Sequence, residues 1–105
     1  MTIPEISVHD LAALGADARI VDVREPDEWE GGHIAHATHV PLGTVVDHVG
    51  EFDGTPTYVI CLVGGRSLRA CEFLAAQGRD VVNVAGGMRA WATAGYDIVP
   101  GRDGG

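Results

Sequence analysis

The chain has 105 residues, 46% of them hydrophobic and 21% charged, which is the composition of one folded domain rather than of a disordered chain. Its net charge of −8 and its lack of lysine exclude the basic surfaces that bind nucleic acid or anionic membranes. The longest apolar run, Tyr58–Val63, is far shorter than the ~20 residues that cross a bilayer. Because residues 1–5 also lack the basic and apolar regions of a secretory signal, we expect a cytoplasmic protein.

The first third of the chain alternates short helices with a strand. Ser7 and Asp10 have the spacing of a capping box and predict a helix that ends at Gly15. The β-branched run at residues 19–23 predicts a buried strand. Residues 26–32 begin with a proline and two acids and end with two glycines, a pattern that predicts a second short helix.

The rest of the chain continues this alternation. Apolar spacing and glycine-containing turns predict a brief strand at 38–40, an amphipathic helix at 42–52, a strand at 57–61, a helix at 67–77, a strand at 81–84 and a short helix around Met88 and Trp91. Strands that alternate with helices imply right-handed crossovers and a mainly parallel sheet. We therefore expect a three-layer α/β domain over residues 1–100, with helices on both faces of the sheet, and a flexible Gly-rich tail at 101–105.

Three predicted strand ends carry the sequences most suited to a functional site. The carboxyl ends of parallel strands meet at one edge of a sheet, where α/β domains bind their ligands. The segments expected at that edge are residues 22–24, 61–66 and 85–87. Residues 1–53 have a net charge of −9 and residues 54–105 a net charge of +1, so a bound anion would lie in the second half.

The loop after Cys61 has the features of an anion-binding cradle. Gly64 and Gly65 permit positive φ, so successive backbone N–H groups can curl toward the sulfur. The next helix contributes its positive dipole end, with Ser67 as a candidate N-cap, and Arg66 adds a permanent positive charge at the rim. The pattern predicts a thiolate nucleophile at Cys61. The alternative is a small buried hydrophobic cysteine beside a tight turn.

Three segments recur in the order and spacing of a known family. They are Asp22-Val23-Arg24-Glu25 with Glu28-Trp29 and Gly32-His33-Ile34, then Tyr58-Val59-Ile60-Cys61 with Gly64-Gly65-Arg66-Ser67, and finally Gly86-Gly87 with Trp91 and Ala94-Gly95. Together they resemble the signatures of the single-domain rhodanese-like family, and the resemblance covers nearly the whole chain. It implies a rhodanese-like fold and a sulfurtransferase that moves a sulfane sulfur from thiosulfate or another persulfide donor to cyanide or a thiol, including a protein thiol. It implies no organic cofactor.

The resemblance also implies the roles of individual residues. Cys61 would attack the sulfane sulfur and carry it as a persulfide. Asp22 and Arg24 would border the pocket in supporting roles. Ser67 is expected to support the loop through its position as the candidate helix cap, which comes from the sequence pattern rather than from the resemblance. The loop that binds the anionic donor through its amides and its arginine would be Leu62, Val63, Gly64, Gly65 and Arg66.

Two features of the loop bear on the chemistry. From Cys61 to Arg66 the spacing is C-x4-R, whereas the phosphatases that resemble this family have C-x5-R, which makes a phosphatase or arsenate reductase the lesser alternative. Leu62 and Val63 stand where the family often has a polar or basic residue, so we expect thiosulfate to be a poor donor. The same apolar pair leaves open a module that binds a partner or senses sulfane sulfur without turnover.

Two further groups invite a functional interpretation. His33, His36 and His39 lie three residues apart, but the extended path expected before Pro41 would not align them, so we expect no metal site. Cys71 could be a resolving thiol, although its helical spacing from Leu68 and Leu74 favours a position in the core. Cys61 and Cys71 are the two cysteines of the chain, and they do not form a CxxC pair.

Overall fold

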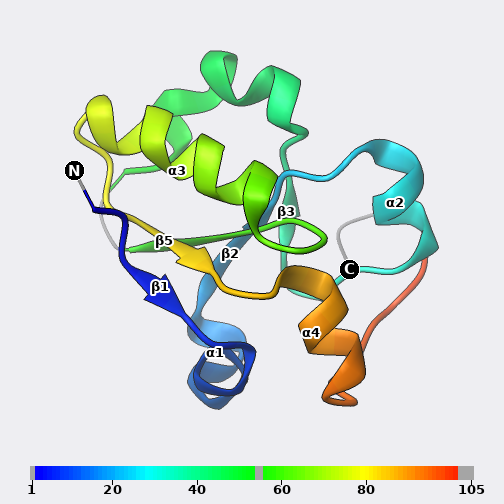
Figure 1. Ribbon diagram of the computed structural model, residues 1–105. Coiled ribbons are helices and arrows are strands. Elements are labelled where there is room, and N and C mark those ends of the chain that lie inside the picture. Colours follow the sequence, from blue (N-terminus) through cyan, green and yellow to red (C-terminus); the bar gives the residue numbers. More distant parts are fainter. Residues whose placement is uncertain (1, 54–55, 102–105) are drawn as a thin grey trace.

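The computed structural model describes residues 2–53 and 56–101, and these form one five-stranded sheet with helices on both faces (Figure 1). The strands are all parallel and lie in the order β1-β5-β4-β2-β3. Their bounds are β1 (Glu5–Ile6), β2 (Arg19–Asp22), β3 (Thr38–His39), β4 (Thr57–Ile60) and β5 (Val81–Val84). The predicted α/β class with a parallel sheet is confirmed.

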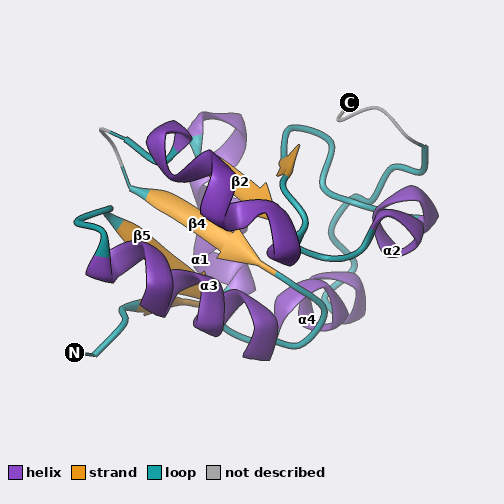
Figure 2. Ribbon diagram, turned by 90° about the horizontal axis from the view of Figure 1, so that it is seen from above, coloured by secondary structure: helices purple, strands orange, loops and turns teal. Residues whose placement is uncertain are grey.

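The helical segments divide between the two faces of the sheet. Their bounds are α1 (Val8–Leu14), η1 (Gly15–Asp17), α2 (Pro26–Gly31), η2 (Leu42–Glu51), α3 (Gly65–Ala76) and α4 (Gly87–Thr93). One core cluster joins the sheet to α3 and η2, and the other joins it to α1, α4 and Trp29 of α2. Figure 2 shows α3 running beside β4 and β5, which it contacts. No helix among residues 2–53 and 56–101 is long and apolar enough to cross a membrane.

Of two helices predicted from the sequence, one is confirmed and the other has a different geometry. The Ser7 hydroxyl accepts the Asp10 N–H at 3.0 Å and the first helix ends at Gly15, both as expected. The segment predicted as an amphipathic helix at 42–52 is instead a 3-10 helix with non-helical angles at His48. It contains two glycines and four β-branched residues, all of low helix propensity, which accounts for the tighter and broken geometry.

The first residues of the chain differ from the prediction. The two-residue strand β1 was not predicted, because a pair of residues shows no periodicity; it pairs with β5 at one edge of the sheet. At the other end of the chain, the Gly101 N–H donates to the Glu30 carbonyl at 3.0 Å. The remainder of the predicted tail, 102–105, lies outside the described residues.

Candidate active site at the carboxyl edge of the sheet

The three strand ends singled out from the sequence meet at one edge of the sheet. The Val23 N–H continues the ladder by donating to the Ile60 carbonyl at 3.0 Å, so the segment after β2 lies beside the end of β4. On the other side of β4, the Met88 N–H donates to the Cys61 carbonyl at 2.8 Å. This arrangement places Cys61 at the centre of the edge.

Cys61 is fully buried and its sulfur is surrounded by hydrogen-bond donors. The Gly64 N–H lies 3.1 Å from Sγ and the Ser67 hydroxyl oxygen lies 3.3 Å from it. Burial acts to raise the pKa of Cys61, but the Ser67 hydroxyl and the backbone N–H groups of Ser67, Gly64 and Val63 outweigh it, so the pKa of the thiol is lowered. The site therefore favours a thiolate.

The loop's amide groups are oriented from behind by α4. The Cys61 carbonyl accepts the Met88 N–H at 2.8 Å and the Leu62 carbonyl accepts the Arg89 N–H at 2.9 Å. In a trans peptide the N–H points away from the carbonyl of the same unit, so the N–H groups of Leu62 and Val63 are directed away from α4. These bonds hold the open curl of the loop that the amide cradle requires.

Gly87 makes this close approach possible. A Cβ at position 87 would lie 2.4 Å from the Cys61 carbonyl oxygen and 2.6 Å from the backbone of Leu62, and φ there is +56°. Only glycine fits both the backbone conformation and the space. The glycine of the third sequence segment is thus required for the geometry of the second.

The start of α3 corrects one sequence-based assignment. Gly64, with φ of 109°, occupies the N-cap position and α3 begins at Gly65, two residues before the predicted start. Ser67 therefore lies in the first turn rather than capping it. Its hydroxyl faces Cys61 Sγ at 3.3 Å, the Gly64 carbonyl at 3.2 Å and Asn83 Oδ1 at 2.5 Å.

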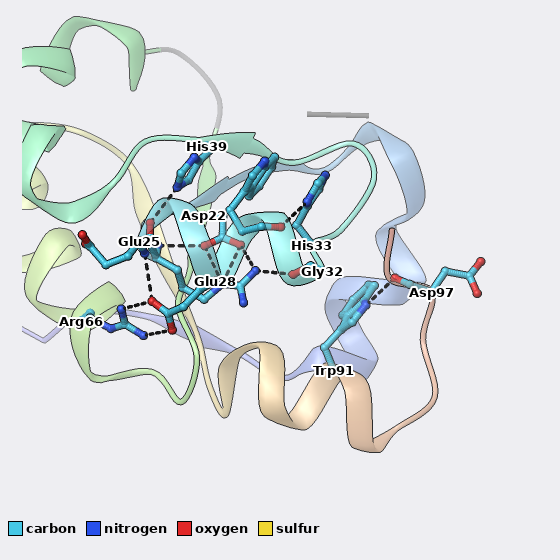
Figure 3. Close-up of polar contacts among 11 residues, drawn as sticks. Asp22, Glu25, Glu28, Gly32, His33, His39, Arg66, Trp91 and Asp97 are labelled. Atoms are coloured by element: carbon cyan, nitrogen blue, oxygen red, sulfur yellow. Dashed lines mark hydrogen bonds and ion pairs between the residues drawn. The ribbon is translucent and has the colours of Figure 1, made fainter. Parts of the chain in front are cut away.

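Arg66 is directed toward α2 and paired there, rather than left as an uncompensated charge at the rim. Its Nη1 and Nη2 lie 2.7 Å and 2.9 Å from the two carboxylate oxygens of Glu28 (Figure 3). This hydrogen bonding lowers the pKa of Glu28 to about 2, so the pair is ionised at neutral pH. The positive charge expected for anion binding is thereby largely neutralised.

Asp22 and Arg24 form a second ion pair, which is buried at the carboxyl end of β2. Arg24 Nη2 lies 2.9 Å from Asp22 Oδ2 and 2.7 Å from the Gly32 carbonyl, and the Arg24 backbone N–H donates to Asp22 Oδ1 at 3.0 Å. Asp22 is fully buried and Arg24 is 5% exposed. The pair fixes the segment after β2 against α2.

An open cavity of about 540 Å³ lies beside the loop. Leu62 lines it together with Met88 and Ile98, and Arg24, Glu28 and Arg89 add charged groups. Val63, the other apolar loop residue, is 53% exposed, and with Ala90 it lines a neighbouring cavity. The approaches to the cradle are therefore largely apolar.

The remaining candidates lie in the core or apart from one another. His33 and His39 both stack on the Trp29 ring, at centroid distances of 3.6 Å and 4.7 Å, and His36 is exposed. Nowhere in the described parts of the chain do three or more potential ligands gather around a metal position. Cys71 is fully buried in the core, and burial raises its pKa to about 12.

Sequence reasoning did not assign roles to Glu28 and Asn83. Glu28 fell within the first family-like segment, but nothing in the sequence showed that it would meet an arginine 38 residues away. For Asn83 the sequence offered one signal, which is that a polar residue interrupts the apolar run 81–84. Asn83 is 1% exposed in the structure.

Comparisons with known proteins agree with this geometry. The sequence pattern of the Rhodanese-like domain matches residues 7–94. The YtwF protein of Bacillus subtilis is 40% identical over 95 residues, which span 87% of this chain and 92% of YtwF. The thiosulfate sulfurtransferase GlpE of Pseudomonas entomophila is 37% identical over 89 residues, 82% of each chain. A crystal structure of a rhodanese-related protein from Thermoplasma volcanium superposes with a TM-score of 0.86 at 33% identity, covering 91% of this chain and 97% of that one.

Proposed function

This chain belongs to the rhodanese-like domain family, and from that premise we propose that it is a sulfurtransferase in which Cys61 carries the sulfur. One observation supports this assignment above all: a buried cysteine at a strand end accepts hydrogen bonds from the Gly64 N–H and the Ser67 hydroxyl. Such donors stabilise a thiolate, the form of cysteine that attacks sulfur.

The proposed reaction has two balanced steps. In the first, the Cys61 thiolate attacks the outer sulfur of thiosulfate, the S–S bond of the donor breaks, and sulfite leaves with the electron pair. Cys61 then holds a persulfide whose negative charge is on the outer sulfur. In the second step cyanide attacks that sulfur, thiocyanate leaves, and the Cys61 thiolate is regenerated. A thiol acceptor in its thiolate form would take the sulfur in the same way and become a persulfide.

The residues around Cys61 have separate parts in this reaction. Gly64 and the other loop amides would stabilise the anionic sulfur, and Ser67 would stabilise the thiolate when it leaves. Leu62 and Val63 would contact the body of the donor, with Gly65 and Arg66 completing the loop. Asp22 and Arg24 would hold the neighbouring strand end. The reaction needs no organic cofactor and no metal.

The donor class follows from the charges at the loop. Thiosulfate is a small dianion, and Arg66 would meet it with a charge already satisfied by Glu28. The apolar walls formed by Leu62 and Met88 are better matched to the carbon body of an organic persulfide. We therefore propose that organic persulfides are better donors than thiosulfate. We also propose that a small thiol or a protein thiol is the acceptor. The protein would act in the cytoplasm without binding nucleic acid or membranes.

Intact mass measurement tests the proposal directly. The wild type is incubated with thiosulfate, or with glutathione persulfide, and then with cyanide, beside a matched Cys61→Ser variant. We expect the wild type alone to gain the mass of one sulfur atom and to lose it again with cyanide. If neither donor modifies Cys61, sulfur transfer is wrong for this protein.

A second candidate is a module that stores or senses sulfane sulfur without turnover. The Arg66–Glu28 pair favours it, because the pair reduces the charge available to bind an anionic donor. Steady-state production of thiocyanate separates the two: an enzyme turns over many times per Cys61, whereas a carrier stops after one. Hydrolysis of p-nitrophenyl phosphate that is lost in Cys61→Ser would instead support the phosphatase alternative.

A further inference from the structure

The Ser67 hydroxyl has more hydrogen-bond acceptors than it can serve. It carries one hydrogen, yet Asn83 Oδ1 lies 2.5 Å away, the Gly64 carbonyl 3.2 Å and Cys61 Sγ 3.3 Å. The shortest of these contacts is to Asn83, not to the sulfur. Any gain of the hydrogen by Cys61 is therefore a loss for Asn83.

The orientation of the Asn83 amide is fixed by its other contacts. Its Nδ2 lies 2.9 Å from Glu5 Oε2 and 3.3 Å from the Gly64 carbonyl, both of which are acceptors. The amide nitrogen must therefore face Glu5, and the oxygen must face Ser67. Asn83 is 1% exposed, so bulk water does not replace a lost partner.

We propose that Asn83 is a positioning residue that competes with Cys61 for the Ser67 hydrogen. When Cys61 is a thiol, its S–H can donate to the Ser67 oxygen while Ser67 donates to Asn83. When Cys61 is a thiolate, the hydroxyl rotates and donates to the sulfur, which leaves Asn83 Oδ1 without that donor. Asn83 thus opposes ionisation of Cys61 and sets how strongly Ser67 stabilises the thiolate.

This competition matters at each step of the proposed function, on which its catalytic meaning rests. In the persulfide the charge moves to the outer sulfur, so Ser67 returns to Asn83. When the acceptor removes the outer sulfur, Ser67 turns again to the departing thiolate. A thiolate that is stabilised less strongly is also the better nucleophile, because nucleophilicity falls as the thiol pKa falls.

Several charged and titratable groups surround this network. Glu5 of β1 contacts Asn83, Arg66 lies on the first turn of α3 and is paired with Glu28 of α2, and Cys71 lies one turn beyond Ser67. The thiolate at Cys61 acts electrostatically on both Arg66 and Cys71. Substitution of Asn83 by an uncharged residue leaves all of these charges in place.

A double-mutant cycle tests the proposal. All variants carry Cys71→Ala, so that iodoacetamide reports on Cys61 alone, and the alkylation rate is measured against pH. We expect Asn83→Leu to increase the rate about threefold at a pH below the thiol pKa, because Ser67 then donates only to sulfur and the Gly64 carbonyl, and the larger thiolate fraction outweighs the lower nucleophilicity of each thiolate. We expect Ser67→Ala to decrease it about tenfold. In the Ser67→Ala background, Asn83→Leu should have no effect.

The controls separate this role from a structural one. Thr57→Val removes another fully buried hydroxyl, one with no partner among the described residues, and should leave the alkylation profile unchanged. Asn83→Ala repeats the test should the leucine variant unfold. An unchanged or slower rate in the Asn83 variants, or an equal change with and without Ser67, would overturn the proposal. Because alkylation needs no sulfur donor, failure of sulfur transfer in the mass experiment would leave this result interpretable.

Discussion

Arg66 of the candidate anion-binding loop and Glu28 of α2 are joined by two hydrogen bonds, of 2.7 Å and 2.9 Å, across 38 residues of sequence. The arginine is the last residue of the C-x4-R loop, and the glutamate belongs to the segment that follows β2. The contact therefore links two of the three strand ends that form the site. It also means that a residue outside the loop, Glu28, determines how much of the positive charge of Arg66 is available to a bound anion.

Glu28→Gln should improve the use of thiosulfate. The substitution keeps the shape of the side chain but removes the negative charge, so Arg66 is free to attract the dianion. We expect the KM for thiosulfate to fall about threefold to tenfold, the range of one additional charge-assisted hydrogen bond. Steady-state thiocyanate production measures it. Glu30→Gln makes the same charge change on an exposed residue of α2 and should leave KM unchanged; equal effects in both variants would contradict the role of the pair.

The same pair should contribute to stability in a pH-dependent way. Its hydrogen bonding with Arg66 lowers the pKa of Glu28 from 4.5 to about 2. A carboxyl group with a lowered pKa stabilises the fold fully above its unfolded-state value and loses that contribution as the pH falls toward the folded-state value. Both side chains are about one-third exposed, at 32% and 27%, so screening limits the contribution to about 1 kcal/mol or less.

We therefore expect wild type and Glu28→Gln to differ by a constant amount in free energy of unfolding above about pH 4.5, and the difference to shrink between pH 4.5 and 2. Urea unfolding at a series of pH values measures this. A difference that grows on acidification would contradict the assignment.

Gly87→Ala should damage the loop although it lies outside it. Its Cβ would lie 2.4 Å from the Cys61 carbonyl oxygen, and the backbone must hold a φ of +56°. We expect a loss of at least about 2 kcal/mol in stability, from the clash and the strained backbone together, and slower alkylation of Cys61 as the amides move.

Gly95→Ala is the matched control for this substitution. Its φ is +83°, but a Cβ there would meet nothing within 4 Å, so the cost should be about 1 kcal/mol from the backbone alone. Equal losses of stability at the two positions would show that the contact with the loop is unimportant.

The parts of the fold that depend on local patterns were predictable from the sequence. The apolar runs at 19–23, 57–61 and 81–84 form buried strands. Because helices cover both faces of the sheet, the apolar side chains on either face of each strand pack against a helix. From their parallel order it followed that the strand ends would meet. That step required no knowledge of side-chain positions, and it identified the edge that carries Cys61.

The side-chain pairings of the site were not predictable in the same way. Serine is a residue type that often caps helices, but Gly64 occupies the N-cap position here. Its left-handed conformation starts α3 at Gly65, two residues before the predicted start. The hydroxyl is then free to face Cys61 and Asn83. The sequence does not show which acidic residue pairs with Arg66. Only the folded position of α2 shows that Glu28 lies within reach. These interactions join residues that are distant in sequence, so no local pattern records them.

Leu62→Arg should make thiosulfate a better donor relative to an organic persulfide. Leu62 follows Cys61 directly and lines the cavity beside the loop, where Met88 and Ile98 form its apolar walls. An arginine there adds a charge that Glu28 does not already neutralise, so we expect the KM for thiosulfate to fall about threefold to tenfold. Because part of the apolar wall is lost, kcat/KM for glutathione persulfide should not rise in parallel.

Val46→Arg adds the same charge at a residue of η2 that is 61% exposed, and it controls for a general electrostatic effect on the approach of anions. A thiosulfate KM as low in the wild type as in Leu62→Arg would show that the apolar residue after Cys61 does not determine the choice of donor.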